Sequence, residues 1–174
     1  MIVIGVDLAG KPSNPTGLCA KEGEGKVFKT VYSEKEITSF IEEFKPLVVA
    51  IDAPIMKGEP RIRLADKLLR RYGALPPTLE SMRDLTIRGS RLAERLSKHY
   101  EVIEVFPTAT AKILKIYRRD YRRTADILGV NVRNKHELDA YLCCLTAEYY
   151  LKGEVERIGD SDGWVIVPRK LVSH

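Results

Sequence analysis

The sequence predicts an α/β domain built on one mixed sheet, and three observations support this class. The chain has 174 residues and is 44% hydrophobic, which suits a single domain over residues 1–174 with a substantial core. Its first segment reads as three consecutive strands, and the remainder alternates strands with helices. The apolar run at residues 47–52 is continuous, which is typical of a strand covered on both faces.

The first three strands are expected at residues 2–7, 17–21 and 26–32. The letters "EGEG" between the second and the third are typical of a tight turn. Ser33 then precedes Glu36 by three residues, which is a capping box and predicts the start of a helix. This helix should run to about residue 44 with one apolar face, formed by Ile37, Phe40, Ile41 and Phe44.

The second half of the chain continues the alternation. After the strand at 47–52, helices are expected at 61–72 and 81–99, then a strand at 102–106. In the first of these helices, the inward side chains should be Ile62, Ala65, Leu68 and Leu69. The remaining elements are a helix over 108–128 with one break, a strong helix over 135–151, and a short C-terminal strand pair around a DG turn.

Acidic residues end or interrupt the apolar strands. Asp7 ends the first strand, Asp52 ends the fourth, and Glu104 lies within the fifth. If the first strand pairs with the fourth, Asp7 and Asp52 lie side by side at the carboxyl edge, where open α/β sheets place their sites. Ala9 and Gly10 would leave room there for a ligand. A turn-forming role for Asp52 and a structural ion pair for Glu104 are the alternatives.

Several motifs together resemble one protein family over nearly the full length of the chain. They are "GVDLAG" with "PTGL", "IDAP", "LTIRG", "VIEVFPTA", "HELDAYLCCLTA" and "IGDSDGWVIVP". The chain resembles domain-of-unknown-function family 429, described as predicted nucleases of the ribonuclease H fold. The "HELDA" segment is similar to the His-x-x-Asp-Ala element of RuvC-like resolvases in that superfamily. The resemblance implies a five-stranded mixed sheet in the order 3-2-1-4-5, with helices on both faces.

The resemblance also implies a metal-dependent site. Superfamily nucleases take carboxylates from the first strand, the fourth strand and a late helix, which here are Asp7, Asp52 and Asp139, with Glu104 as a fourth candidate. Two Mg²⁺ or Mn²⁺ ions held by such oxygen ligands activate water and neutralise charge on the attacking and leaving oxygens. His136, three residues before Asp139, shares its helix face and is a further catalytic candidate, or else a helix-start residue.

The chain departs from the RuvC-like pattern at two places. RuvC-like enzymes often carry Glu on the fourth strand, where this chain has Asp52. They also carry paired acids on the last helix, whereas Glu137 and Asp139 are two residues apart and do not face alike. The metal ligation is therefore the open part of this prediction.

Two sets of basic residues are candidates for binding substrate phosphates. Arg61, Arg63 and Arg88 follow the fourth strand on the side of the expected site, although ion pairs with Asp66, Asp84 or Glu94 are an equal alternative. The second set is expected on one face of the helix over 108–128, where a solvated charged face is the alternative. It comprises Lys112, Lys115, Arg119 and Arg122.

The composition of the chain limits its possible partners and its expected location in the cell. The net charge of +5 permits a polyanionic partner such as nucleic acid. The absence of Gln, with only three Asn, resembles the composition of thermophile proteins. The three cysteines contain no CxxC pair and are interpreted as core residues. No apolar run is long enough to span a membrane and no signal peptide is present, so a cytoplasmic location is expected.

The sequence thus predicts a divalent-metal-dependent nuclease that hydrolyses phosphodiester bonds of RNA, an RNA–DNA hybrid or branched DNA. A non-catalytic nucleic-acid-binding protein on the same scaffold is the main alternative. A phosphotransferase of the sugar-kinase and actin group is disfavoured, because the chain lacks a second domain and the Gly-rich phosphate loops. The oligomeric state is left open, a homodimer included, and no partner protein is predicted.

Overall fold

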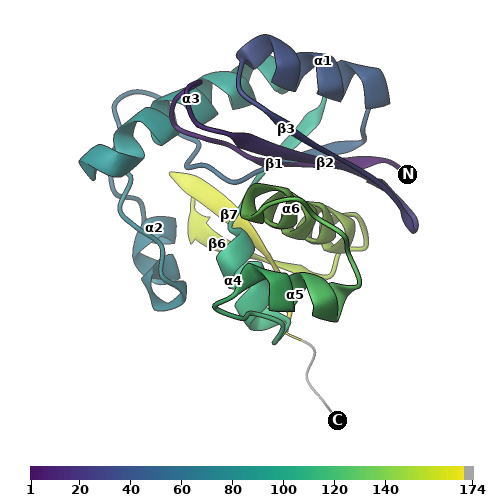
Figure 1. Cartoon of the computed structure of the whole chain (residues 1–174). Coiled ribbons are helices and arrows are strands. Elements are labelled where there is room, and N and C mark those ends of the chain that lie inside the picture. The colour runs from purple at the N-terminus through teal and green to yellow at the C-terminus, as the bar shows by residue number, and fades with distance from the viewer. Residues whose placement is uncertain (171–174) are drawn as a thin grey trace.

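The computed structural model describes residues 1–170, which form one seven-stranded sheet with helices on both faces (Figure 1). The strands are β1 Val3–Asp7, β2 Thr16–Glu22, β3 Gly25–Val31, β4 Val48–Ile51, β5 Glu101–Val105, β6 Val155–Asp160 and β7 Gly163–Pro168. The helices are α1 Glu34–Phe44, α2 Leu64–Leu69, α3 Glu80–Leu96, α4 Pro107–Ile113, α5 Tyr121–Leu128 and α6 Lys135–Leu151, with a 3-10 turn at Arg70–Tyr72.

The sheet order is β3-β2-β1-β4-β5-β7-β6. The predicted order 3-2-1-4-5 is present within it: β1, β4 and β5 run parallel to one another, and β2 pairs antiparallel with both β1 and β3. The prediction of five strands with a separate C-terminal pair is wrong, because β7 pairs in parallel with β5 and extends the sheet to seven strands. This pairing covers the outer edge of β5, which would otherwise present unpaired backbone groups. The tight turn between β6 and β7 is confirmed, with Asp160 opposite Gly163.

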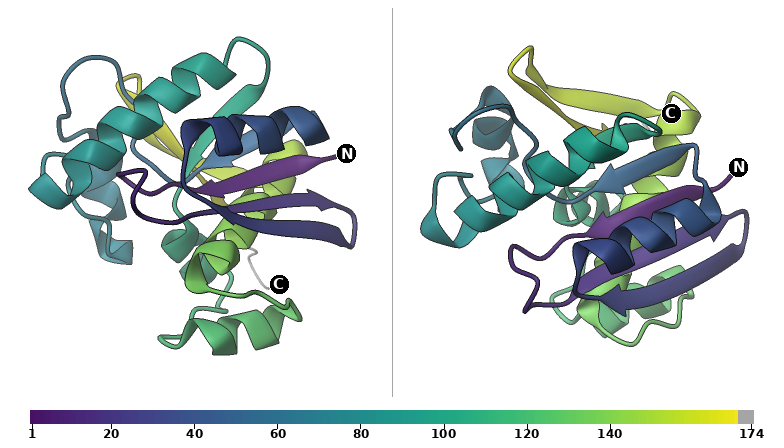
Figure 2. Two further views of the ribbon diagram at one scale, coloured as in Figure 1. Left: turned by 45° about the horizontal axis from the view of Figure 1, so that its top comes forward. Right: turned by 90° about the horizontal axis from the view of Figure 1, so that it is seen from above.

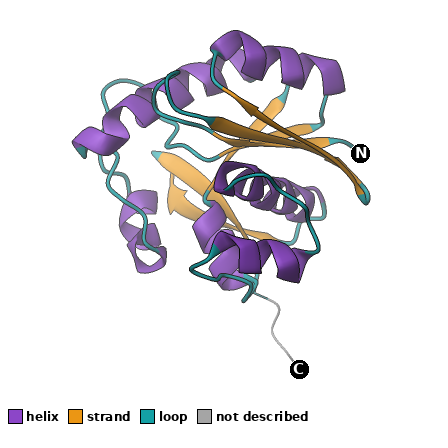
Figure 3. Ribbon diagram, in the orientation of Figure 1, coloured by secondary structure: helices purple, strands orange, loops and turns teal. Residues whose placement is uncertain are grey.

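Two helical layers enclose the sheet (Figures 2 and 3). α1 and α3 pack on one face, against alternate residues of β1 and β4 such as Ile4 and Ile51. α6 packs on the other face with α4 and α5, against the intervening residues such as Val3 and Ala50. All four residues of β4 have no exposed surface, which confirms the prediction of a strand covered on both faces. No helix within residues 1–170 is long and apolar enough to cross a membrane.

The capping box at the start of α1 is confirmed. The Ser33 hydroxyl accepts from the Glu36 backbone N–H at 3.1 Å, and the Glu36 carboxylate accepts from the Ser33 N–H at 3.1 Å. The helix ends as predicted, and Ile37, Phe40 and Ile41 are buried.

Replacing Ser33 with Ala is expected to lower the free energy of unfolding by about 1 kcal/mol, because an orphan N–H of the first turn loses its acceptor. Urea denaturation followed by circular dichroism measures the change. Ser39→Ala, at an exposed position within the same helix, is the matched control and should not destabilise. Equal destabilisation by both changes would contradict the capping role.

α6 lies in direct backbone contact with β1 and β2 because both strands carry a glycine beneath it. A Cβ atom at Gly5 would lie 2.0 Å from the Ala140 carbonyl oxygen, and one at Gly17 would lie 2.1 Å from the His136 carbonyl oxygen. Any other residue at these two positions would push the helix away from the sheet. The N-terminal turns of α6 are therefore held against the end of β1 that carries Asp7 and against the neighbouring start of β2.

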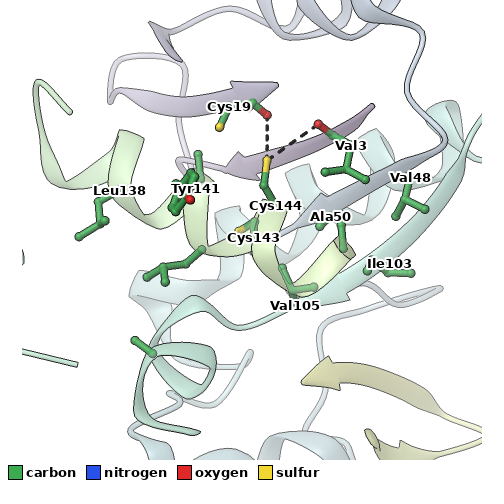
Figure 4. Packing of buried hydrophobic residues seen from close by; sticks show 14 of the residues in the cluster. Val3, Cys19, Val48, Ala50, Ile103, Val105, Leu138, Tyr141, Cys143 and Cys144 are labelled. Carbon is green, nitrogen blue, oxygen red and sulfur yellow. Dashed lines mark hydrogen bonds between the residues drawn. The ribbon is translucent and has the colours of Figure 1, made fainter. Parts of the chain in front are cut away.

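The three cysteines belong to the core between α6 and the sheet, as the sequence predicts (Figure 4). All three are free thiols without exposed surface. The Cys144 thiol points at the sheet and donates to the Cys19 carbonyl oxygen at 3.2 Å. Burial raises the pKa of Cys143 and Cys144 well above the usual value, so both stay protonated and act as apolar packing groups.

Two predicted helices differ from the structure. The helix expected at 61–72 is shorter and begins at Leu64, and Ile62 and Leu68 are exposed instead of inward. The side chain that points inward at the start of this segment is that of Arg63, which is fully buried.

The single break expected in the helix over 108–128 is present, but it is a whole loop that separates two helices. α4 ends at Ile113, and Lys115 adopts a left-handed backbone conformation with φ of 62°. α5 begins only after Asp120, whose carboxylate accepts from the Arg122 N–H at 3.1 Å. The predicted single basic face is therefore wrong, because Lys112, Lys115, Arg119 and Arg122 do not share one helix.

Candidate active site

Asp7 and Asp52 lie on neighbouring parallel strand ends. Val6 of β1 is opposite Ile51 of β4, and the Asp52 N–H donates to the Val6 carbonyl at 2.9 Å. Val6 and Ile51 both contact the α1 and α3 layer, so the alternation of strand side chains directs the next residues toward α6. The two aspartates are therefore adjacent at the carboxyl edge, beneath the start of α6.

α6 adds His136 and Asp139 to this edge. The His136 Nδ1 atom lies 3.0 Å from Oδ2 of Asp7, and the side chains are 41% and 15% exposed. Asp139 follows one helical turn later on the same side of α6. The glycine contacts beneath α6 set this placement, because they fix the height of the helix above the strand ends.

The electrostatics of the site are those of crowded carboxylates. Burial raises the pKa of Asp52 well above its usual value, and the charges of Asp7 and Asp139 raise it further. Burial and the charge of Asp7 raise the pKa of Asp139 to about 7, although Lys135 and His136 act in the opposite direction. The hydrogen bond to Asp7 raises the pKa of His136. These shifts indicate a site in which buried negative charge exceeds the nearby positive charge.

The carboxylates of Asp7, Asp52 and Asp139 are chemically suited to bind a hard divalent cation. Carboxylate oxygens are the ligands that Mg²⁺ and Mn²⁺ prefer, and such an ion offsets the burial and the repulsion that raise the pKa values of Asp52 and Asp139. Within residues 1–170, however, no three His, Cys, Asp or Glu side chains stand close enough together to hold an ion as they lie. Binding would therefore require side-chain rotation of Asp7, Asp52 and Asp139 toward a common point.

Glu104 lies apart from the aspartates. It pairs with Ile51, not with Asp52, so its side chain points to the opposite face of the sheet. There its two oxygens accept from Nη1 and Nη2 of Arg63 at 2.7 and 2.8 Å, and one also accepts from the Ile55 N–H. Burial raises the pKa of Glu104, and the bonds from Arg63 partly offset this. The arrangement is the structural ion pair that the sequence left as the alternative.

Arg63 is the centre of a buried ion network. Its side chain has no exposed surface, and it binds Asp66 at 2.8 Å in addition to Glu104. The Asp66 carboxylate also accepts from the Arg63 backbone N–H at the start of α2. Arg63 therefore does not face solvent, where a phosphate would bind.

Arg61 and Arg88, the other two arginines predicted to bind phosphate after the fourth strand, are both engaged in ion pairs. Arg61 pairs with Asp162 of the β6–β7 turn. Arg88 pairs with Glu34 and donates to the Ala9 carbonyl at 2.7 Å and the Tyr32 carbonyl at 2.9 Å, so it holds the loop after Asp7.

The second basic set lies around the loop between α4 and α5 and is exposed. Lys112 donates to the Tyr72 carbonyl at 3.2 Å, and Arg122 pairs with Asp120. Lys115 and Arg119 are exposed in the loop itself.

Two residues that support the site, Thr16 and Asn134, were not singled out by the sequence interpretation, and Glu137 has a different role from the acid pair considered there. Thr16 is fully buried and accepts from the Ala9 N–H at 3.0 Å, which orders the loop after Asp7. Asn134 caps α6 by accepting from the Glu137 N–H at 3.0 Å. Glu137 is buried and accepts from Arg133 and Thr30, so it anchors the helix start instead of joining Asp139 in an acid pair. An Asn followed three residues later by Glu is a capping signature, which could have identified the last two.

Comparison with solved structures gives a likeness in fold. No family model matches the chain, and no curated protein matches it, so membership of family 429 stays a prediction. Among solved structures, the chain is similar to RuvC of T. thermophilus in complex with a Holliday junction substrate. The TM-score is 0.54 with 17% sequence identity, and the likeness covers 88% of this chain and 97% of that one. The fold is therefore ribonuclease H-like.

Proposed function

We propose that the protein is a divalent-metal-dependent nuclease that hydrolyses phosphodiester bonds of nucleic acid. The observation that carries the proposal is the convergence of Asp7, Asp52 and Asp139 at one sheet edge, with His136 bonded to Asp7. The net charge of +5 and the likeness to a RuvC bound to a Holliday junction support nucleic acid as the substrate. RNA, an RNA–DNA hybrid and branched DNA remain the candidate forms.

Each residue of the site has a separate role in the proposed reaction. Asp7, Asp52 and Asp139 would hold two Mg²⁺ or Mn²⁺ ions, which supply water activation and charge neutralisation at the phosphate when bound. Asp7 also orients His136 by its hydrogen bond to Nδ1, which leaves the Nε2 edge of the partly exposed ring to face the substrate. The raised pKa of His136 favours the imidazolium, which can hold a proton for the leaving oxygen.

Glu104 is placed outside the metal-binding set in this proposal. Its carboxylate faces away from Asp52 and is saturated by Arg63 and the Ile55 N–H. Because Ile55 follows shortly after Asp52, Glu104 acts as a positioning residue that fixes the turn carrying Asp52.

A cleavage assay tests the proposal. Labelled single-stranded, duplex, hybrid and four-way-junction substrates are incubated with Mn²⁺ or Mg²⁺ and either the wild type or Asp7→Asn. Cleavage of one substrate class by the wild type is expected, with a loss of at least about 100-fold in the variant, because metal contributes several kcal/mol to such a transition state. Asp126→Asn, at an exposed position on α5, removes the same charge and should cleave normally.

No cleavage of any substrate by the wild type, with unchanged binding in Asp7→Asn, would contradict the nuclease proposal. It would favour a non-catalytic nucleic-acid-binding protein on this scaffold. One observation supports that second candidate, namely that no three potential ligands within residues 1–170 are gathered around a common point. Calorimetric titration with Mn²⁺ separates the two, because only a functional site loses its binding of the ion in Asp7→Asn.

A further inference from the structure

A groove of about 430 Å³ lies between α3, the start of α1 and the loop that follows β1. α1 and α3 cover the face of the sheet opposite to α6 (Figure 1), so this groove is distinct from the aspartate cluster. Its lining includes Gly10, Lys11, Glu34, Arg88, Arg91 and Arg95. No aromatic side chain is among its lining residues.

The charge of the groove is positive and partly uncompensated. Glu34 pairs with Arg88, and Asp84 lies 3.7 Å from Lys11. Arg91 and Arg95 have no ion-pair or hydrogen-bond partner among the side chains of residues 1–170, and both are exposed. Two guanidinium groups are therefore available to a ligand that enters the groove.

The groove adjoins the loops that carry the aspartates. α3 packs tightly on both of them, since a Cβ at Gly89 would lie 2.5 Å from Cβ of Ala53, and one at Gly10 would lie 3.2 Å from the Leu85 nitrogen. Arg88 donates to the Ala9 carbonyl, two residues after Asp7. A nucleic-acid strand that crosses the carboxyl edge of the sheet at Asp7 and Asp52 can therefore continue along the exposed side of α3.

We propose that this groove binds the phosphate backbone of the substrate strand beside the scissile bond, through Arg91 and Arg95. The inference rests on the proposed function and deepens it, because it assigns the contacts that position the strand. The two residues are one helical turn apart, about 6 Å along α3, and each guanidinium fork matches a phosphate. The lack of aromatic lining means that the groove contacts backbone and not bases, so binding there is independent of base sequence.

The test measures binding without metal, so that it does not depend on cleavage. Fluorescein-labelled single-stranded DNA, duplex DNA and a four-way junction are titrated in EDTA at several salt concentrations, with anisotropy as the readout. Arg91→Gln with Arg95→Gln is expected to weaken binding about tenfold and to lower the slope of log K against log salt by about 2. Arg70→Gln with Arg71→Gln, on the exposed turn after α2, removes the same charge outside the groove and should leave the slope unchanged.

The outcomes separate the groove from the catalytic site. An unchanged slope in the Arg91 and Arg95 variant, or an equal fall in the control variant, overturns the inference even if the wild type cleaves DNA. Displacement of the labelled DNA from the wild type by AMP at equal phosphate concentration also overturns it, because the groove then binds a free nucleotide. A selective fall in slope without any cleavage in Mn²⁺ supports the groove and contradicts the nuclease proposal. Where the wild type cleaves, the variant should raise KM and leave kcat unchanged.

Discussion

Replacing Asp52 with Asn is expected to abolish metal-dependent cleavage and, at the same time, to stabilise the metal-free fold at pH 8. Burial and the charges of Asp7 and Asp139 raise the pKa of Asp52 in the folded state. A carboxyl group whose pKa is higher in the folded than in the unfolded state favours folding below its unfolded pKa. That contribution is lost as the pH rises through the folded pKa. The wild type therefore loses stability as the pH rises from about 4, through the pKa of about 7 for Asp139 and through the raised pKa of Asp52.

An Asn at position 52 carries no charge, so it removes this repulsion. The free energy of unfolding in EDTA should rise by about 1–2 kcal/mol at pH 8, which corresponds to a few degrees in Tm for a chain of this size. The gain should disappear at pH 4, where the wild-type carboxyl group is protonated. Thermal denaturation of the wild type, Asp52→Asn and the exposed control Asp126→Asn at both pH values measures this. A gain of equal size at pH 4 and pH 8 would show that repulsion is not its cause.

Replacing Arg63 with Ala is expected to cause the largest loss of stability of any single change considered. Arg63 has no exposed side-chain surface, and it neutralises Glu104 and Asp66, which are both 8% exposed. Its removal leaves two buried carboxylates without a cation and opens a cavity, which costs about 3–5 kcal/mol. Urea denaturation at pH 7 measures the loss. Arg83→Ala breaks an exposed pair with Glu59 and should cost less than about 1 kcal/mol.

Two further measurements identify the cause of that loss. Adding Glu104→Gln to Arg63→Ala should restore part of the stability, because one stranded charge is removed. Lowering the pH toward 4 should also reduce the difference between Arg63→Ala and the wild type, since burial raises the pKa of Glu104 and, without Arg63, this carboxylate takes up a proton in the folded variant. A difference that is constant with pH and unaffected by Glu104→Gln would assign the effect to packing alone.

The adjacency of Asp7 and Asp52 could be predicted from the sequence because it follows from local rules. Each aspartate ends an apolar strand, and two parallel neighbouring strands bring their carboxyl ends to the same edge. The capping box and the apolar face of α1 could also be predicted from the sequence, since both depend on residues three or four positions apart.

The side of the sheet on which Glu104 lies could not be predicted from local sequence. Its distance from the aspartates depends on the register between β4 and β5, in which it pairs with Ile51. A shift of one residue would have placed it on the α6 face, and nothing local in "EVIEV" decides that register.

Three features could not be predicted, for related reasons: the burial of Arg63, the pairing of the C-terminal hairpin with β5, and the loop between α4 and α5. A buried Arg is rare and is recognisable only once Asp66 and Glu104 are known to surround it. The pairing of β7 with β5 joins segments about sixty residues apart along the chain. The left-handed conformation of Lys115, which separates α4 from α5, occurs at a residue type that seldom adopts it.

The close contact of α6 with Gly5 and Gly17 has a thermodynamic consequence for the site. Asp7 ends β1 and Asp52 directly follows β4, whereas Asp139 belongs to α6. An ion that all three aspartates coordinate would therefore add a further link between two layers that packing and side-chain hydrogen bonds such as His136–Asp7 and Thr30–Glu137 already join. Its binding free energy would add to the free energy of docking α6, and a loosened helix would weaken ion binding by the same amount. The affinity for the cation and the free energy needed to detach α6 from the sheet would then change together, because ion binding and helix docking are coupled.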